Sequence, residues 1–164
     1  MNPPKYSIWL LPTKNDHKLL YNKIEELSKV YHSEMFQPHC TLFSPVFDME
    51  LAKDIIHEID INPFRVKSIN LNQSSTIWKT VFIELEKNES LNQLYKMFHD
   101  VFPSSDEFKP HISLIYKTMP KKERMNIIAI LDIQKSYEFG GIAIVETSGS
   151  IDEWKTKNQV IWNK

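Results

Sequence analysis

The chain has 164 residues, of which 41% are hydrophobic, so it can form one domain with a sizeable core but not a separate second domain. Its 20 basic and 21 acidic residues give a formal net charge of −1, which provides no overall field for attracting a long polyanion such as duplex nucleic acid. No apolar run approaches the roughly 20 residues that span a bilayer, and the N-terminus lacks the order of a signal peptide, so we expect a cytoplasmic protein with no membrane contact.

The chain begins with a predicted strand and a predicted helix. Residues 6–11 form an apolar, partly aromatic run that is typical of a buried strand. Apolar residues then recur at helical spacing, among them Leu20 and Ile24, which predicts a helix with one buried face. Asn15 or Asp16 is placed to cap the start of this helix.

A second helix and a β-hairpin are predicted further along the chain. Asp48 is placed to cap the helix, which closes before Pro63. Residues 64–71 and 76–85 are two β-forming runs joined by the polar residues 72–75, so we expect them to pair as a hairpin.

The rest of the chain repeats this order of elements. Ser90 and Gln93 have the spacing of a capping box, which predicts the start of a third helix. Pro120 is placed at or near the first position of a fourth helix. Residues 137–145 and 159–162 supply the last strands, and residues 76–85 take the part that residues 6–11 take in the first half.

A seven-residue motif occurs twice and relates the two halves. Residues 36–42 read Phe-Gln-Pro-His-Cys-Thr-Leu, and residues 108–114 read Phe-Lys-Pro-His-Ile-Ser-Leu, so five of the seven positions repeat in kind. With residue frequencies of a few per cent each, chance would produce this repeat in roughly one case in 10,000. The repeat therefore indicates a duplication inside one domain.

Each copy of the motif places a histidine and a hydroxyl group on one face of a strand. Side chains alternate between the two faces, so His39 and Thr41 point the same way, as do His111 and Ser113. Cys40 then points to the opposite face, toward the core, which excludes it as a nucleophile beside His39.

These motifs resemble those of the two-histidine phosphoesterases, whose defining feature is a pair of His-x-Ser/Thr motifs. Residues 6–12, the continuation of the second motif into Tyr116, and residues 142–145 ahead of Trp154 resemble the cyclic phosphodiesterase branch of that family. The resemblance implies a single α+β domain over residues 1–164. It would be a bilobal pseudo-twofold duplication, with two antiparallel sheets facing a central groove and helices on the outside.

The residue types suit hydrolysis of a cyclic phosphodiester without a cofactor. Opening the ring with water requires a base and an acid, and imidazole serves both purposes near pH 7. The resemblance implies that His39 and His111 are the catalytic pair, and we favour His111 as the base and His39 as the acid. Thr41 and Ser113 are expected to hold the non-bridging phosphate oxygens.

Two aromatic residues are candidates for substrate binding. The resemblance places Trp9 and Tyr116 along the substrate groove, where a base or a ribose could stack. For Trp9, core packing is an equally good interpretation. Tyr116 lies five residues after His111, so a regular strand would turn it to the other face, and a bend is required. The remaining tryptophans are assigned to packing.

The predicted substrate is a nucleoside 2′,3′-cyclic phosphate or the cyclic phosphate of ADP-ribose, and we expect a monomeric enzyme. Two alternatives stay open: processing of short RNA ends or 2′,5′-linked oligonucleotides, and nucleotide binding without turnover. A metal site is not expected, because a catalytic zinc normally has three protein ligands, and His39 and Cys40 point apart.

Overall fold

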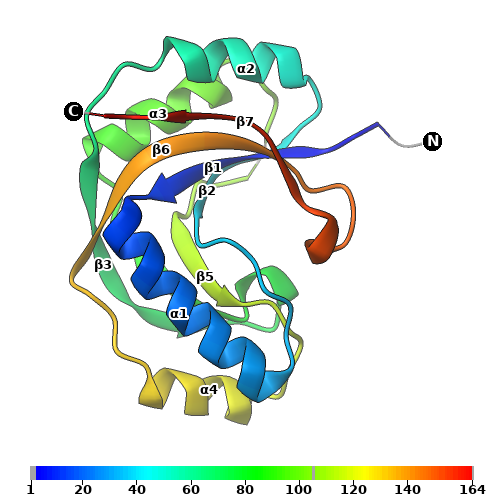
Figure 1. Ribbon diagram of the computed structural model, residues 1–164, viewed down its shortest axis with the longest axis vertical. Coiled ribbons are helices and arrows are strands. Elements are labelled where there is room, and N and C mark those ends of the chain that lie inside the picture. Colours follow the sequence, from blue (N-terminus) through cyan, green and yellow to red (C-terminus); the bar gives the residue numbers. More distant parts are fainter. Residues whose placement is uncertain (1–2, 105, 164) are drawn as a thin grey trace.

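The computed structural model, which describes residues 3–104 and 106–163, has an α+β fold in which helices lie outside a curved antiparallel sheet (Figure 1). The helices are α1 (Lys14–Tyr31), α2 (Met49–Glu58), α3 (Glu89–His99) and α4 (Lys121–Ile130). The strands are β1 (Tyr6–Pro12), β2 (Cys40–Val46), β3 (Phe64–Gln73), β4 (Val81–Leu85), β5 (His111–Ile115), β6 (Ser136–Glu146) and β7 (Lys155–Ile161). Two short 3-10 helices are η1 (Ile77–Lys79) and η2 (Ile151–Glu153).

The strands form one sheet in the order β1-β2-β5-β4-β3-β6-β7, with an additional pairing between β1 and β6. The long strand β6 joins the two halves, because its first residues pair with β3 and its later residues pair with β1. The two motif strands, β2 and β5, meet at a second junction. The two sheets expected from the sequence are therefore connected by hydrogen bonds into one.

The predicted duplication is visible in the order of the elements. The first half is β1-α1-β2-α2-β3, the second is β4-α3-β5-α4-β6, and β7 is added at the end. The halves also exchange their helices: α1 packs on the motif strand β5 of the second half, and α3 packs on the motif strand β2 of the first. Each motif strand is therefore covered by a helix of the other half.

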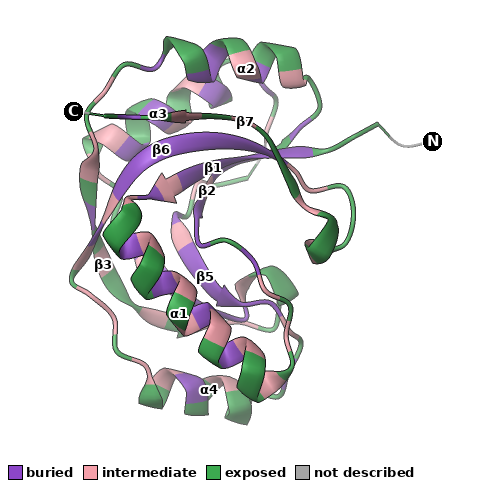
Figure 2. Cartoon of the chain, viewed as in Figure 1, coloured by how far each residue is buried: buried purple, intermediate pink, exposed green. Residues whose placement is uncertain are grey.

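The core lies between the helices and the strands. Figure 2 shows β1, β5 and β6 buried along most of their length, whereas the helices alternate between buried and exposed residues. The predicted inner face of α1 is confirmed, since Leu20, Ile24 and Leu27 are buried. None of the helices in the described part of the chain is long and apolar enough to cross a membrane.

The predicted cap of α1 was wrong. The helix begins at Lys14 with Thr13 in the N-cap position, and Asp16 lies inside the first turn. The Asp16 carboxylate is buried and accepts hydrogen bonds from the backbone N–H of Glu138 (2.7 Å) and the side chain of Gln134 (3.0 Å). A tertiary contact with the start of β6 therefore decides the position of Asp16.

The other predicted helix starts had mixed outcomes. The Asp48 carboxylate accepts the backbone N–H of Leu51 at 3.1 Å, as the sequence predicted. Helix α3 begins earlier than the predicted capping box, because Asn88 accepts the N–H of Leu91 at 2.9 Å and Ser90 lies within the helix.

Two strand boundaries also differ from the prediction. Residues 77–79 form η1, so β4 begins only at Val81. The last strand begins at Lys155 rather than near residue 159, and it extends along β6.

Candidate active site

The two motif strands are direct neighbours, and Cys40 of β2 pairs with Ile112 of β5 in antiparallel register. Continued by one residue in each direction, this register puts His39 opposite Ser113 and Thr41 opposite His111. Cys40 and Ile112 are fully buried in the core. The two histidines and two hydroxyl residues therefore share the other face of the β2–β5 junction.

Both histidines make the same hydrogen bond to the backbone two residues earlier. The Nδ1 atom of His39 lies 2.7 Å from the carbonyl oxygen of Gln37, and that of His111 lies 2.9 Å from the carbonyl oxygen of Lys109. A carbonyl oxygen can only accept, so Nδ1 carries the hydrogen in each ring. The Nε2 atom of each neutral imidazole is thus free to accept or return a proton.

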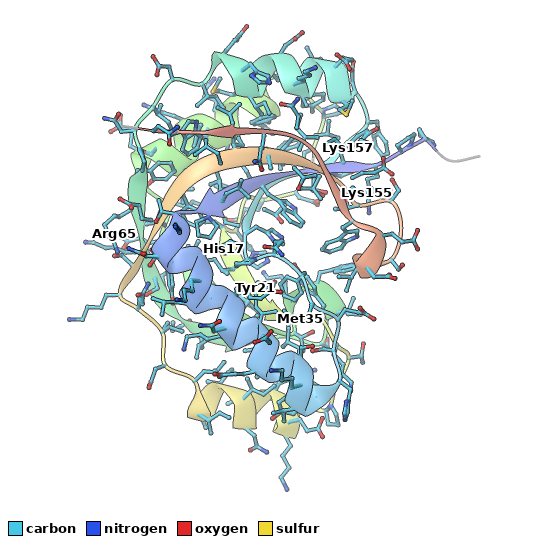
Figure 3. All side chains as sticks on the ribbon, in the orientation of Figure 1. His17, Tyr21, Met35, Arg65, Lys155 and Lys157 are labelled. Atoms are coloured by element: carbon cyan, nitrogen blue, oxygen red, sulfur yellow. The ribbon has the colours of Figure 1, made fainter. Side chains whose placement is uncertain are left out.

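The segment before His39 is attached to α1. His17 Nε2 lies 2.8 Å from Gln37 Oε1, so the helix holds the residue whose carbonyl orients the His39 ring. Figure 3 shows His17 and Tyr21 on α1, and Met35 in the segment that follows this helix. This attachment fixes the loop that leads into the first motif.

Each histidine also contacts an aromatic ring on the strand beside it. The His39 imidazole stacks on Trp9 with a centroid distance of 3.5 Å and an interplanar angle of 4°. In the second half, Phe82 meets His111 edge to face at 5.4 Å. Trp9 pairs with Thr41 and Phe82 pairs with Ser113 in the sheet, so Phe82 is the counterpart of Trp9.

The sequence left both substrate binding and core packing open for Trp9, and the structure places it beside His39. Trp9 is 5% exposed, and the imidazole of His39 covers one of its faces. Trp154 contacts its ring at 5.7 Å. This arrangement orients His39 through ring stacking.

Burial lowers the pKa of both histidines. For His39, burial lowers the pKa to about 3; the carbonyl of Gln37 opposes this effect, and the charge of His111 adds to it. For His111, burial also lowers the pKa, the carbonyl of Lys109 raises it, Lys79 lowers it and Glu84 raises it. Both rings are thus neutral at pH 7 in the free protein, and a bound phosphate anion would favour the protonated forms.

The two hydroxyl groups have different surroundings. Thr41 is partly exposed, whereas Ser113 is buried and its Oγ donates to the backbone carbonyl of Trp78 at 2.9 Å. The hydroxyl of Tyr116 also lies beside Ser113. Ser113 therefore connects the second motif to η1, and it must release the Trp78 carbonyl before it can donate to a phosphate oxygen.

Tyr116 lies in the site because β5 ends at Ile115. Its ring packs against Phe36 at 4.1 Å, Trp78 at 5.3 Å and Trp154 at 5.8 Å. Burial raises the pKa of its hydroxyl, so Tyr116 is a neutral hydrogen-bond donor. Residue 116 lies outside β5, so the alternation along that strand does not fix the direction of its side chain.

Trp78 and Trp154, which the sequence assigned to packing, form an aromatic cluster with Phe36 and Tyr116. Trp78 on η1 is 49% exposed, and its ring lies 5.7 Å from that of Trp154. Trp154 also contacts Trp9 and Tyr116. No sequence pattern separates them from core tryptophans, because η1 and η2 bring them here through the tertiary fold.

Two cavities lie near the histidine pair: one is lined by His111, and the other by residues that contact His39. The cavity beside His111 has a volume of about 780 Å³, and its lining includes the lysines 79, 87 and 109 together with Phe82 and Glu84. The cavity on the His39 side has a volume of about 220 Å³ and is lined by Trp9, Phe36, Gln37 and Trp154. Figure 3 shows Lys155 and Lys157, both exposed, on β7, the strand that follows Trp154.

The side chains that could bind a metal do not gather at this site. Within residues 3–104 and 106–163, no group of three or more His, Cys, Asp or Glu side chains could hold a metal ion. Cys40 is buried on the core side, where burial raises the pKa of its thiol to about 12. The predicted position of Cys40 is therefore confirmed, and its thiol lies away from the histidines.

The sequence matches a family model, and several solved structures share the fold. The family model described as cyclic phosphodiesterase-like protein matches residues 5–161. No curated protein sequence matches the chain. Among solved structures, LigT of E. coli complexed with 3′-AMP has 16% sequence identity and a TM-score of 0.62, over 99% of this chain and 100% of LigT.

Two further solved structures share the fold. TT0787 of Thermus thermophilus has 12% identity and a TM-score of 0.62, over 96% of this chain and 97% of that one. Usb1 of Kluyveromyces marxianus has 10% identity and a TM-score of 0.50, over 93% and 96%. At these identities, the similarity to solved structures supports the fold alone. The match to the family model supports membership of a sequence family.

Proposed function

Since the chain belongs to the cyclic phosphodiesterase-like family, we propose that it hydrolyses a cyclic phosphodiester to a phosphomonoester, with His39 and His111 as its acid–base pair. The preferred substrate class is a nucleoside 2′,3′-cyclic phosphate or the cyclic phosphate of ADP-ribose. The observation that carries this proposal is the register of β2 and β5, which puts two histidines and two hydroxyl groups on one face.

The arrangement suits a displacement at phosphorus. One neutral imidazole removes a proton from water, and the other, protonated, donates to the leaving ribose oxygen. The carbonyl oxygens of Gln37 and Lys109 fix the tautomer of each ring, so both reactive Nε2 atoms are defined before substrate arrives. No cofactor is needed for these steps.

The hydroxyl groups are proposed to bind the phosphate. Thr41 can donate to one non-bridging oxygen directly. Ser113 would exchange its hydrogen bond to the Trp78 carbonyl for a hydrogen bond to a second non-bridging phosphate oxygen. The Tyr116 hydroxyl beside Ser113 could take part in that exchange. The partly exposed ring of Trp78 offers an edge of the aromatic cluster to a nucleobase.

One observation favours a second candidate function, the processing of short RNA ends or 2′,5′-linked oligonucleotides. The cavity of about 780 Å³ beside His111 holds Lys79, Lys87 and Lys109, and it is larger than the cavity on the His39 side. An additional nucleotide could occupy it, with its phosphate near these lysines.

A turnover screen distinguishes the two candidates. Purified protein is incubated with 2′,3′-cyclic mononucleotides, the cyclic phosphate of ADP-ribose, cyclic-ended di- and trinucleotides, and 2′,5′-linked dinucleotides, and products are separated by chromatography. Preference for the mononucleotides or the cyclic phosphate of ADP-ribose supports the first proposal. A higher kcat/KM for the longer substrates supports the second, and absence of product from every substrate contradicts both.

A further inference from the structure

The duplicated site differs between its halves at the residue that faces each histidine. On β4, Glu84 pairs with His111 across the sheet. On β1, the pairing of Leu10 with β2, continued by one residue, brings Leu11 opposite His39. Side chains at directly opposed positions lie on the same face, with Cβ atoms about 5 Å apart. One histidine therefore faces a carboxylate and the other faces an aliphatic side chain.

The surroundings of His39 oppose a positive charge on its ring. The residue is 5% exposed and lies between Trp9 and Phe36. Leu11 packs with the small apolar cluster that includes Trp9. The charged group that acts on His39 is His111, and two positive imidazoles repel each other. Of the two rings, His39 is therefore the less favourable site for a proton.

The surroundings of His111 are less apolar. His111 is partly exposed at the edge of the cavity of about 780 Å³. The Glu84 carboxylate accepts a hydrogen bond from Asn72 Nδ2 on β3, which fixes it in the sheet. The charge of Lys79 lowers the pKa of His111, whereas that of Glu84 raises it. The Nζ atom of Lys79 lies 4.7 Å from the centroid of the Phe82 ring, which contacts His111. The other charged residues that line this cavity are Glu86, Lys87, Glu107 and Lys109.

We propose that Glu84 is the positioning residue that favours the protonated form of His111 when substrate is bound, which makes His111 the general acid and His39 the general base. This assignment rests on the function proposed above, and it reverses the roles favoured from the sequence. A bound phosphate would neutralise the opposing charge of Lys79, so the effect of Glu84 is strongest when substrate is present.

The resulting step is balanced. His39 Nε2 removes a proton from water as the water oxygen forms a bond to phosphorus. The bond from phosphorus to one ribose oxygen breaks, and that oxygen takes the proton from His111 Nε2. The product is a phosphomonoester with a free hydroxyl, and the two imidazoles return to their starting states by exchanging protons with solvent.

The direct test is an NMR titration of the imidazole rings in the intact protein. In Glu84→Gln, the pKa of His111 should fall by about half a unit, the effect of one partly exposed charge. Glu84→Asp keeps the carboxylate, so the pKa of His111 should stay close to its value in the parent protein. Glu86→Gln removes the same charge from the lining of the same cavity and should change nothing. An unchanged His111 pKa in Glu84→Gln, or a His39 that gains its proton at higher pH than His111, overturns the assignment.

A kinetic arm tests the roles, with thymidine 3′-(4-nitrophenyl phosphate) as a substrate whose leaving group departs without a proton. His111→Ala should lose about 10²- to 10⁴-fold in kcat/KM on a 2′,3′-cyclic mononucleotide but less than about tenfold on the aryl ester, whereas His39→Ala should be impaired on both. Glu84→Gln should lose about 2- to 5-fold on the cyclic substrate at about pH 7.5. The opposite pattern for the two histidines overturns the roles. The titration needs no turnover, so it decides the effect of Glu84 even if the proposed activity fails.

Discussion

Cys40 on β2 lies directly opposite Ile112 on β5, and both side chains are fully buried in the core. On the other side of the strands, the same register assembles the four motif residues. The close approach of the two strands is maintained by α1 and α3, each of which packs on the motif strand of the other half. The duplication thus produces one composite site rather than two separate ones.

The two histidines should be individually required and act together. We expect His39→Ala and His111→Ala each to lower kcat/KM on a 2′,3′-cyclic mononucleotide by about 10²- to 10⁴-fold, the usual contribution of a positioned acid or base. The double variant should lose less than the product of the two single effects, because both residues act on one transition state. His57→Ala, a change on α2 remote from the motifs, serves as the control. Parent-level activity in either single variant would remove that histidine from the mechanism.

The sequence identified both motif strands because its evidence is local and repeated, but it placed them in two facing sheets rather than side by side in one sheet. Residues 36–42 and 108–114 identify both motif strands, and alternation along a strand puts the histidine and hydroxyl of each copy on one face. The helix caps were harder to predict, since Thr13, Asn15 and Asp16 are all good capping residues. The choice depends on the bond between Asp16 and the backbone of β6, which no local pattern contains.

The environment of the site could not be predicted for a related reason. Trp78 and Trp154 come from short segments whose positions depend on the whole fold. Glu84 was detectable in principle, because aligning the predicted strand 76–85 with residues 6–11 would place it at the position of Leu11. The strand start was predicted too early, at residue 76 rather than Val81, and this concealed the register.

The two hydroxyl groups should behave differently when removed. Thr41→Val should lower kcat/KM and leave the free energy of unfolding nearly unchanged, since Thr41 is partly exposed. Ser113→Ala should lower both, because the Trp78 carbonyl loses its donor, at a cost of about 0.5–1.5 kcal/mol. Urea denaturation and steady-state kinetics on the same preparations measure the two effects. Equal stability losses would show that the bond to Trp78 does not distinguish them.

Trp9 should act through His39. We expect Trp9→Leu to lower kcat by about 2- to 10-fold, because a stacked ring pair contributes about 0.5–1.5 kcal/mol. Trp9→Phe retains a ring and should recover most of the activity. If Trp9 instead stacks on the substrate, the main effect of Trp9→Leu would be a higher KM with kcat preserved, and that result would restore the role expected from the sequence.

The burial of His39 should make stability fall in mild acid. Its pKa is lowered from 6.5 to about 3 on folding, so below pH 6.5 the unfolded chain binds a proton that the folded protein excludes. Stability from this group is fully present above pH 6.5 and is lost as the pH falls toward about 3, with a slope of up to about 1.4 kcal/mol per pH unit. His111 contributes in the same direction.

Urea denaturation between about pH 7.5 and 4.5 measures this effect, and His39→Gln is the matched variant. The variant should show a shallower loss of unfolding free energy below pH 6.5 than the parent, whatever its stability at the upper end of the range. Parallel curves for the two proteins would show that His39 is not held neutral by the fold.

The most direct measurement of the central proposal is hydrolysis of a 2′,3′-cyclic mononucleotide, followed by ³¹P NMR with and without a chelator. A paired-histidine phosphodiesterase should convert the cyclic phosphate to a monoester at the same rate in both conditions, and His39→Ala and His111→Ala should abolish most of that conversion. A metal-activated water would instead lose activity on chelation and regain it with a divalent ion. That pattern, or undiminished hydrolysis in both histidine variants, would contradict the account.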